Sequence, residues 1–240
     1  MFYLQTIKVI YLKYPFYGYR RIHRQLRRLG INSSVKRVRK AMEQLGLKAI
    51  YPEPKLSAAD KGHKKYPYLL KGLEVKHINQ VWASDITYIK HRGSFMYLSA
   101  IIDLFSRKIL SWKLSNTMDV SICTDVLNEA ICNFGRPEIF NTDQGSQYTS
   151  DVFTDILKGH DIRISMDSKG RALDNVYIER FWRSLKYENI FINDYATVVE
   201  LKQGIIKYIQ FYNSERFHQS LEYKTPDEVY YENEKQAISL

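Results

Sequence analysis

The sequence predicts an α/β protein in which a small, all-α domain precedes a mixed five-stranded sheet flanked by helices. Two observations lead to this prediction. In the first fifty residues, apolar side chains recur every three or four positions and glycines end each run, which is typical of short helices. From Asn79 onward, three stretches rich in β-branched and aromatic residues are followed by alternating helical and extended patterns.

The composition limits the functions that the chain can have. Its 240 residues are 45% hydrophobic, which is enough for one good core and a small second domain. Lys and Arg number 36 against 26 Asp and Glu, and this excess favours a polyanionic partner, most commonly nucleic acid. Cys123 and Cys132 indicate no disulfide scaffold, and no apolar run reaches the roughly 20 residues of a membrane span. We therefore expect a cytoplasmic protein with no membrane partner.

Residues 19–29 form the first helix of a predicted helix-turn-helix. Ile22, Leu26 and Leu29 are spaced by four and three positions, so they share one face of a helix. Gly30 then ends this helix. A brief turn leads to the second helix of the pair.

Residues 35–45 form that second helix, after Ser33 or Ser34 as the N-cap and before Gly46. Its apolar positions are Val35, Val38, Met42 and Leu45. Its exposed face is predicted to carry four cations suited to contact DNA, namely Lys36, Arg37, Arg39 and Lys40. The alternative is a small helical bundle whose basic face is simply solvated. Residues 51–76 contain prolines, glycines and many lysines, which is typical of a basic linker.

The second domain is predicted from five extended segments and three helices. The first three strands form a meander, and helices then alternate with two further strands. The strands are expected at residues 80–90, 94–105, 107–115, 138–143 and 162–167. The helices are expected at residues 119–135, 150–161 and 174–191.

Three acids stand out in this second domain. Asp85 lies in the middle of the first strand, where an acid is costly to bury unless it is paired or bound to a metal. Asp143 follows the fourth strand, and Glu179 lies on the last predicted helix. Three converging acids without a Cys/His cluster suggest hard oxygen ligands for Mg²⁺, with phosphoryl transfer on a nucleic acid as the chemistry. Taken singly, Asp143 is as well explained as an ordinary turn acid.

The helix predicted at residues 174–191 has two different faces. At 100° per residue, Arg183 and Lys186 fall within about 40° of Glu179, and we expect them to contact DNA. The opposite face is apolar and carries Tyr177, Phe181 and Leu185, with Ile178 nearby. At the start of the helix, Asp174 and Asn175 are expected to form the N-cap. Asn175 is one turn before Glu179, and we also expect it to make a minor contact with DNA.

Two neighbouring features have simpler explanations. Asp103, a fourth acid at a strand end, is expected to cap a turn. Gln144 and Gly145 are expected to let the backbone bend sharply beside Asp143.

The spacing of the acids and the strings around them resemble a known family. Thirty-five residues separate Asp143 from Glu179, and Lys186 follows seven residues later. This D…D(35)E pattern with its trailing Lys resembles the integrase-type transposases, and among them the insertion-sequence transposases of the IS-three family. The matching strings include "WASDITYI", "GRPEIFNTDQGSQYTS", "ISMDSKGRALDNVYIERFWRSLKYE" and "YIQFYNSERFHQSLEYKTPDEVY". The N-terminal "YPFYGYRRIHRQL" is similar to the helix-turn-helix of that family.

The resemblance implies an RNase H-like catalytic core with DNA cleavage and strand-transfer activity. It assigns Asp85, Asp143 and Glu179 as the metal-binding and catalytic acids, with Mg²⁺ as the cofactor and Mn²⁺ as a possible substitute. The expected organisation is a helix-turn-helix domain at residues 1–50, the linker at 51–76, a core with C-terminal helices at 77–232 and a tail at 233–240. Retroviral integrases, more distant relatives, carry a His/Cys zinc module, but no Cys precedes Cys123 here and we predict no zinc.

The resemblance also implies partners and a setting. The partners are DNA at the ends of the insertion sequence and at the target, further copies of the chain in a multimer, and a helix-turn-helix protein from an upstream reading frame, either separate or fused. The setting is the cytoplasm of a bacterium, at the nucleoid when bound. Two other functions fit parts of the sequence: a helix-turn-helix regulator without catalysis, and an RNase H-type nuclease acting on hybrids.

Overall fold

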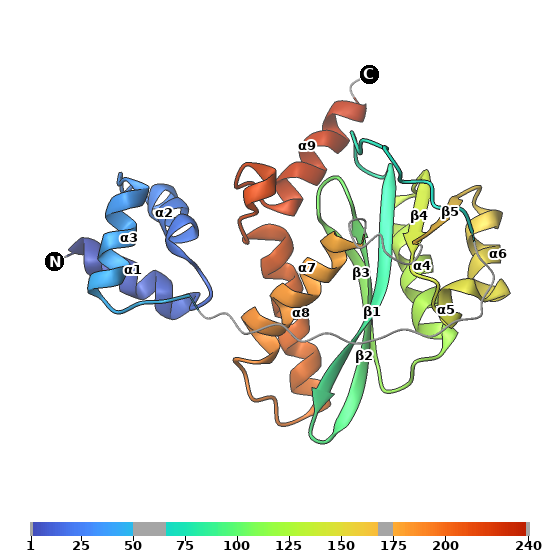
Figure 1. The fold of residues 1–240 in the computed structure, drawn as a ribbon, viewed down its shortest axis with the longest axis horizontal. Coiled ribbons are helices and arrows are strands. Elements are labelled where there is room, and N and C mark those ends of the chain that lie inside the picture. The colour runs from blue at the N-terminus through green and yellow to red at the C-terminus, as the bar shows by residue number, and fades with distance from the viewer. Residues whose placement is uncertain (1, 50–65, 168–174, 239–240) are drawn as a thin grey trace. The chain divides into compact units, whose positions relative to one another are not determined.

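The computed structural model describes residues 2–49, 66–167 and 175–238 (Figure 1). The chain divides into two compact units. The helical unit contains the N-terminal helices together with Lys186–Asn193, and the sheet unit contains the remaining described residues. Most of the linker predicted at residues 51–76 and the predicted N-cap residue Asp174 lie outside the described residues. Residues 66–76 form neither helix nor strand.

The helical unit is built on α1 (Phe2–Lys13), α2 (Tyr19–Arg28) and α3 (Val35–Gln44). The predicted helix pair is present, but its apolar stripe is shorter than expected. Leu29 and Val35 are 56% and 39% exposed because they stand at helix ends, where the chain leaves the core. The buried hydrophobic side chains of this unit are Ile7, Ile10, Tyr14, Phe16, Tyr17, Ile22, Leu26, Val38, Ala41, Met42 and Ile190.

The helix ends of this unit follow the capping signals in the sequence. Gly30 and Gly46 adopt positive φ angles of 75° and 65°, which an L side chain rarely adopts. Ser34, one of the two expected caps, accepts a hydrogen bond from the backbone N–H of Arg37 at 3.2 Å. Glycine and serine therefore set the lengths of α2 and α3.

The sheet unit confirms the predicted mixed sheet of five strands. These are β1 (Val81–His91), β2 (Ser94–Asp103), β3 (Ile109–Ser115), β4 (Ile139–Thr142) and β5 (Arg163–Met166). Their order is β3-β2-β1-β4-β5, in which β2 is antiparallel to both β3 and β1, β4 is parallel to β1, and β5 is parallel to β4. Arg92 and Gly93, both at positive φ, form the two-residue turn between β1 and β2.

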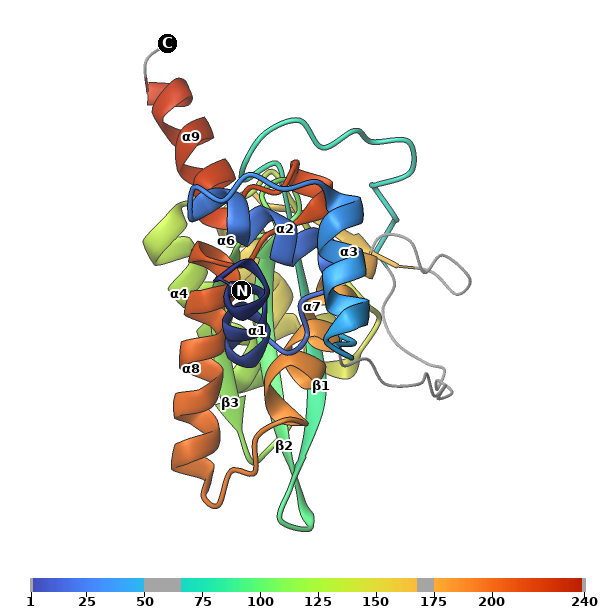
Figure 2. The same cartoon turned by 90° about the vertical axis from the view of Figure 1, so that its left-hand side faces the viewer.

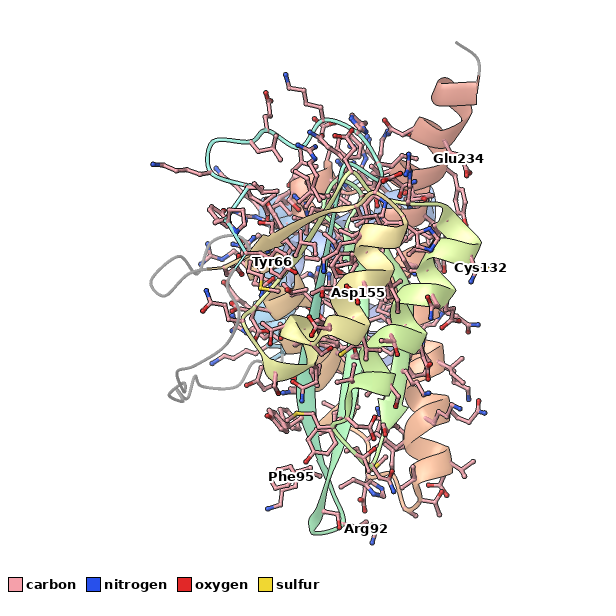
Figure 3. All side chains as sticks on the ribbon, turned by 90° about the vertical axis from the view of Figure 1, so that its right-hand side faces the viewer. Tyr66, Arg92, Phe95, Cys132, Asp155 and Glu234 are labelled. Carbon is pink, nitrogen blue, oxygen red and sulfur yellow. The ribbon has the colours of Figure 1, made fainter. Side chains whose placement is uncertain are left out.

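Helices cover both faces of this sheet (Figures 1 and 2). On one face lie α4 (Val120–Phe134), α5 (Ser146–Thr149) and α6 (Asp151–Gly159). Figure 3 looks onto this face, with Cys132 on α4 and Asp155 on α6 in front of the strands. On the other face lie α7 (Val176–Leu185) and α8 (Val198–Ser214). A short 3₁₀ helix, Gln219–Leu221, precedes α9 (Pro226–Ile238), which extends into the expected tail.

The main core lies between the sheet and the α4–α6 face. Trp82, Phe140 and Met166 from three neighbouring strands meet Val126, Leu127, Phe153 and Leu157 from the helices. Because side chains alternate along a strand, the residues between these core positions point to the α7 face. Ala83, Asp85 and Asn141 belong to that second set, which fixes the side of the sheet on which the candidate site lies.

The helix predicted at residues 174–191 differs from the expectation in its last turn. The α-helical pattern ends at Leu185, and Lys186–Ile190 form a π-helical turn closed by a hydrogen bond from Phe191 N to Lys186 O of 2.8 Å. Within the helical unit, Glu188 of this turn is 8% exposed and pairs with Arg21 at 3.1 Å. The rotation of 100° per residue that placed Arg183 and Lys186 relative to Glu179 therefore holds as far as Leu185 but not at Lys186.

Among the described helices, none combines the length and the apolar character that a membrane crossing needs.

Candidate active site

The strand register places Asp85 and Asp143 side by side. In the parallel pair of β1 and β4, Trp82 is opposite Phe140 and Ala83 is opposite Asn141. Continuing this register by two residues brings Asp85 beside Asp143, which directly follows β4. Neighbouring strands lie about 4.8 Å apart, so two acids that are distant in sequence become close neighbours on one face of the sheet.

Asp85 is surrounded by groups that act on its charge. The pKa of its carboxyl group is raised to about 6, first by burial and then by the charges of Asp143 and, less strongly, Glu179. A hydrogen bond from the indole Nε1 of Trp182 to Asp85 Oδ2, 2.9 Å long, acts in the opposite direction. The three predicted acids, from three separate segments, therefore interact electrostatically within the sheet unit.

Glu179 lies in the first turn of α7 and is exposed, as is Arg183 one turn further along. The apolar face of this helix is buried at Ile178, Phe181 and Leu185. Trp182, three residues after Glu179, is also buried and lies at the border between the two faces. The predicted apolar and charged faces are thus both present on α7. Trp182, which the sequence analysis did not single out, replaces Tyr177 on the buried side.

Asp143 is held by the backbone of the loop that follows it. The N–H of Gly145 donates to Asp143 Oδ1 at 2.9 Å. The expected reason for a glycine here was backbone freedom, and this was wrong, because Gly145 has φ −62° and ψ 149°, angles open to any residue. A Cβ at this position would instead lie 2.9 Å from Asp143 Oδ1. A side chain at position 145 would therefore require the Asp143 carboxylate to move.

A fourth acid, Asp167, lies beside this group and was missed. Thr142 is opposite Met166 in the parallel pair of β4 and β5, so Asp167 follows β5 as Asp143 follows β4. Asp167 accepts a hydrogen bond from Asn141 Nδ2 at 3.1 Å. Burial raises the pKa of Asp167, and the charges of Asp143 and Glu179 add to this effect. Its place at the very end of a predicted strand was the signal that could have identified it.

A buried hydrogen bond connects the strand of Asp85 to the loop of Asp143. On the α4–α6 face, Ser84 and Tyr148 share a hydrogen bond of 2.9 Å, and both side chains are 2% exposed. Ser84 precedes Asp85, and Tyr148 lies on α5, five residues after Asp143. This bond restrains the separation of the two segments that carry these acids.

Two other predicted site residues lie near the ends of α7. Asn175, 9% exposed, precedes α7, and its carbonyl accepts from Glu179 N at 3.0 Å. The side-chain Oδ1 of Asn175 is buried and has no hydrogen-bond partner among the residues that the structure describes. Lys186 begins the π-helical turn and belongs to the helical unit.

The four cations predicted to contact DNA are all exposed on α3. Arg37 lies over the ring of Tyr3, with its guanidinium carbon 4.8 Å from the ring centre, and Arg39 pairs with Glu43 at 3.1 Å. Lys36 and Lys40 make no ion pair with any described residue. These two lysines are therefore the cations of α3 most available to a phosphate.

Asp103 is a structural residue. It is fully buried, and its two oxygens accept from Ser106 N and Ser106 Oγ at 2.7 Å and from Asn79 N at 2.9 Å. The expected role in capping a turn is confirmed.

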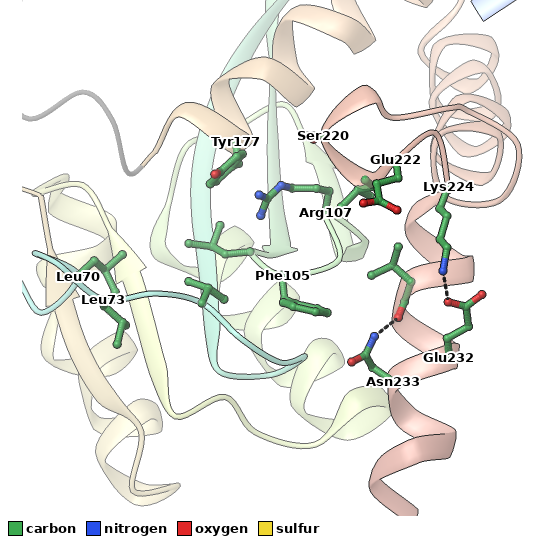
Figure 4. Close-up of a pocket in the computed structure, with 14 residues that line it drawn as sticks. Leu70, Leu73, Phe105, Arg107, Tyr177, Ser220, Glu222, Lys224, Glu232 and Asn233 are labelled. Atoms are coloured by element: carbon green, nitrogen blue, oxygen red, sulfur yellow. Dashed lines mark hydrogen bonds and ion pairs between the residues drawn. The ribbon is translucent and has the colours of Figure 1, made fainter. Parts of the chain in front are cut away.

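A cavity of about 570 Å³ lies elsewhere in the sheet unit (Figure 4). Arg107 and Tyr177 form one wall, with the guanidinium carbon 3.4 Å from the ring centre, and Leu70 lies on another side. The side across from Leu70 includes Lys224 and Glu232, which pair with each other at 2.6 Å. None of the predicted acids lines this cavity, so it is separate from the candidate site.

The donor set around Asp85 suits a hard divalent cation, since every side-chain atom that Asp85, Asp143 and Glu179 offer is a carboxylate oxygen. After burial, the charges of Asp143 and Glu179 contribute to the raised pKa of Asp85, and a bound cation relieves repulsion of this kind. Among the described residues, however, no three Asp, Glu, His or Cys side chains stand close enough together to hold a metal ion as they are placed here.

Family models match both the N-terminal and the C-terminal part of the chain. An HTH-like domain matches residues 3–55, and two models of an integrase core domain match residues 76–172 and 160–226.

Curated relatives match along most of their length. The transposase for insertion sequence element IS904 of Lactococcus lactis is 36% identical over 217 residues, covering 88% of this chain and 85% of that protein. Transposase InsF for insertion sequence IS3A of Escherichia coli is 32% identical over 216 residues, covering 84% of this chain and 72% of its own length.

Solved structures confirm the expected RNase H-like core fold. The catalytic core domain of HTLV-2 integrase, in complex with magnesium, matches with a TM-score of 0.52 at 20% identity, covering 64% of this chain and 97% of that one. The catalytic core domain of BIV integrase matches with a TM-score of 0.52 at 16% identity, covering 67% of this chain and 99% of its own.

Proposed function

The chain belongs to the IS-three family of insertion-sequence transposases, and we propose that Asp85, Asp143 and Glu179 are the catalytic residues with which it cleaves and joins DNA. The observation that carries this assignment is electrostatic. The carboxylates of Asp143 and Glu179, from two other segments, both act on the pKa of Asp85. Such convergence of acids from distant parts of a chain is typical of a functional site.

The same three carboxylates are the proposed ligands of Mg²⁺, or of Mn²⁺ in its place. When bound, such a cation neutralises charge on a phosphodiester and activates an oxygen nucleophile. Asp143 and Glu179 are both exposed, so a change of rotamer, which for Asp143 includes release of its bond to Gly145, would bring them onto a cation beside the less accessible Asp85. The hydrogen bonds from Trp182 and Gly145 each engage one oxygen, Oδ2 of Asp85 and Oδ1 of Asp143.

The proposed reaction uses the DNA's own groups and water. In the first step, water attacks a phosphodiester at the end of the insertion sequence, the bond from phosphorus to the 3′ oxygen breaks, and a 3′-hydroxyl is released. In the second step, this hydroxyl attacks a phosphodiester of another strand, whose own 3′ oxygen leaves with a proton. No covalent bond to the protein forms, and the side chains contribute positioning and charge neutralisation.

The remaining predicted residues are proposed to hold DNA. Lys36, Arg37, Arg39 and Lys40 present positive charge on α3, where phosphates are attracted. In addition, Asn175, Arg183 and Lys186, which lie along and beside α7, are assigned to the strand being cut. We further propose that copies of the chain act as a multimer that pairs two DNA ends.

Incubation of the purified protein with duplexes carrying the terminal repeats tests this function. In Mg²⁺ or Mn²⁺ we expect nicked ends and joined products on a denaturing gel. The Asp143→Asn variant should form neither and still bind the duplex. Cleavage of RNA–DNA hybrids without joining of DNA ends would favour a nuclease, and binding without any cleavage would favour a regulator.

A further inference from the structure

One hydrogen bond connects the strand of Asp85 to the helix of Glu179. The indole N–H of Trp182 donates to Asp85 Oδ2 at 2.9 Å, and Trp182 is three residues after Glu179 on α7. From this geometry we propose that Trp182 is a positioning residue: it fixes the carboxylate of Asp85 relative to Glu179 so that the two can share a divalent cation. The inference rests on the proposed roles of the two acids.

The indole is well suited to hold a carboxylate in place. It is a donor only and cannot compete with the carboxylate as an acceptor or as a ligand. It is also immobile, since Trp182 is 5% exposed and its ring centre lies 4.9 Å from that of Phe181, which in turn packs against Tyr212 at 4.8 Å. A bond to Oδ2 restricts rotation of the Asp85 carboxylate and leaves Oδ1 unoccupied by the indole.

The spacing along α7 adds to this argument. Residues three apart are neighbours on a helix surface, so the turn that presents Glu179 also presents Trp182. Any shift of α7 along the sheet would move Glu179 and break the bond to Asp85 at the same time. Trp182 therefore couples the orientation of one acid to the location of the other.

The chain provides a matched control in Trp82. It lies on β1, three residues before Asp85, is fully buried, and donates its indole N–H to Asn79 Oδ1 at 2.9 Å. Replacement of either Trp by Phe removes a buried indole and a hydrogen bond of the same length. Only the bond of Trp182 ends on a proposed metal ligand.

Mn²⁺ binding to the purified protein, measured by calorimetry, separates positioning from packing. We expect Trp182→Phe to weaken Mn²⁺ binding about 10- to 100-fold, the usual cost of losing a partner of a metal ligand. Trp82→Phe should bind Mn²⁺ within about twofold of wild type, although both variants lose thermal stability. Trp182→His, which keeps a ring N–H, should recover part of the affinity. Equal Mn²⁺ affinities for wild type and Trp182→Phe would overturn the inference.

A second measurement uses the wild-type chain and does not depend on the folding of Trp182→Phe. In protein labelled with ¹⁵N-tryptophan, addition of Mg²⁺ should shift the indole N–H resonance of Trp182 and leave that of Trp82 in place. Trp82→Phe, and Trp112→Phe for the third tryptophan, assign the resonances by elimination. A Trp182 resonance that does not move at saturating Mg²⁺ would contradict the inference.

Failure of the proposed function has a different signature. If Asp85→Asn and Glu179→Gln bind Mn²⁺ as wild type does, the assignment of the acids is wrong. If these two variants lose Mn²⁺ binding and Trp182→Phe keeps it, the assignment stands and only the role of Trp182 is wrong.

Discussion

Asp85 on β1 and Asp143 just beyond β4 occupy equivalent positions on adjacent parallel strands. Two carboxylates in such neighbouring positions repel each other, and the repulsion adds to burial in raising the pKa of Asp85 to about 6. Because ionised Asp85 is unfavourable in the folded protein, both the free energy of unfolding and the binding of a cation should depend on Asp85. Each dependence can be measured.

Without a metal ion, Asp85 should destabilise the fold at neutral pH. Its pKa is about 6 in the folded protein against an ordinary 3.8, so the folded state binds the proton more tightly. Stability therefore falls as pH rises from about 4 to about 6, by up to about 3 kcal/mol. We expect Asp85→Asn to lose this dependence and to be more stable than wild type at pH 7 in EDTA.

Urea unfolding at several pH values checks this prediction. The difference between the two proteins should be small at pH 4 and largest above pH 6. Adding Mn²⁺ at pH 7 should stabilise wild type only, because binding to the folded state adds stability in proportion to occupancy. If the free energy of unfolding changes with pH in the same way for the two proteins, ionised Asp85 does not destabilise the fold.

Gly145→Ala should disturb the site by displacing Asp143. The added Cβ would lie 2.9 Å from Asp143 Oδ1, so the carboxylate or the loop has to move. A displacement of about 1 Å in a catalytic group can reduce the rate about 100-fold, and we expect joining of DNA ends to fall about 10- to 100-fold.

Gly159→Ala is the matched control for this change. Gly159 ends α6, and an added Cβ there meets nothing within 4 Å. This variant should keep wild-type activity and gain about 0.5–1 kcal/mol in stability, since alanine favours the helix. Equal joining activities of the two glycine variants would mean that activity does not depend on the placement of Asp143 beside Gly145.

The salt dependence of DNA binding should identify which cations of α3 contact phosphates. Lys36 and Lys40 make no ion pair with described residues, whereas Arg39 pairs with Glu43. If each lysine neutralises one phosphate, the double variant Lys36→Ala/Lys40→Ala lowers the slope of log affinity against log salt by about 2.

Arg39→Ala should change this slope less. Lys158→Ala, on α6 of the sheet unit, where Lys158 pairs with Asp155 at 2.8 Å, serves as a control for a change of net charge. An unchanged slope in the lysine double variant would place the DNA on another surface.

Much of this arrangement could be predicted from the sequence because it depends on local signals. Gly30, Gly46 and Ser34 end or begin helices through their own backbone and side-chain chemistry, which needs no tertiary information. The five strands follow from short segments of β-branched and aromatic residues. Asp85 stood out because an acid within an apolar strand is unusual at any position.

The rest depended on contacts that a linear pattern does not contain. Trp182 was missed because an indole on an amphipathic helix is most simply explained by packing, and its acceptor lies 97 residues away. Asp167 gains its importance only from the register of β4 and β5. The π-helical turn at Lys186 was also not foreseen, since "KYENI" carries no proline or glycine that would mark a change of helix type.

The most direct test of the central claim is the anomalous scattering of Mn²⁺ in crystals of the wild-type protein grown with that ion. We expect a peak in contact with carboxylate oxygens of Asp85, Asp143 and Glu179, at about 2.0–2.3 Å from each. The peak should disappear in crystals of Asp85→Asn. A peak elsewhere, or three carboxylates that remain apart in saturating Mn²⁺, would contradict it.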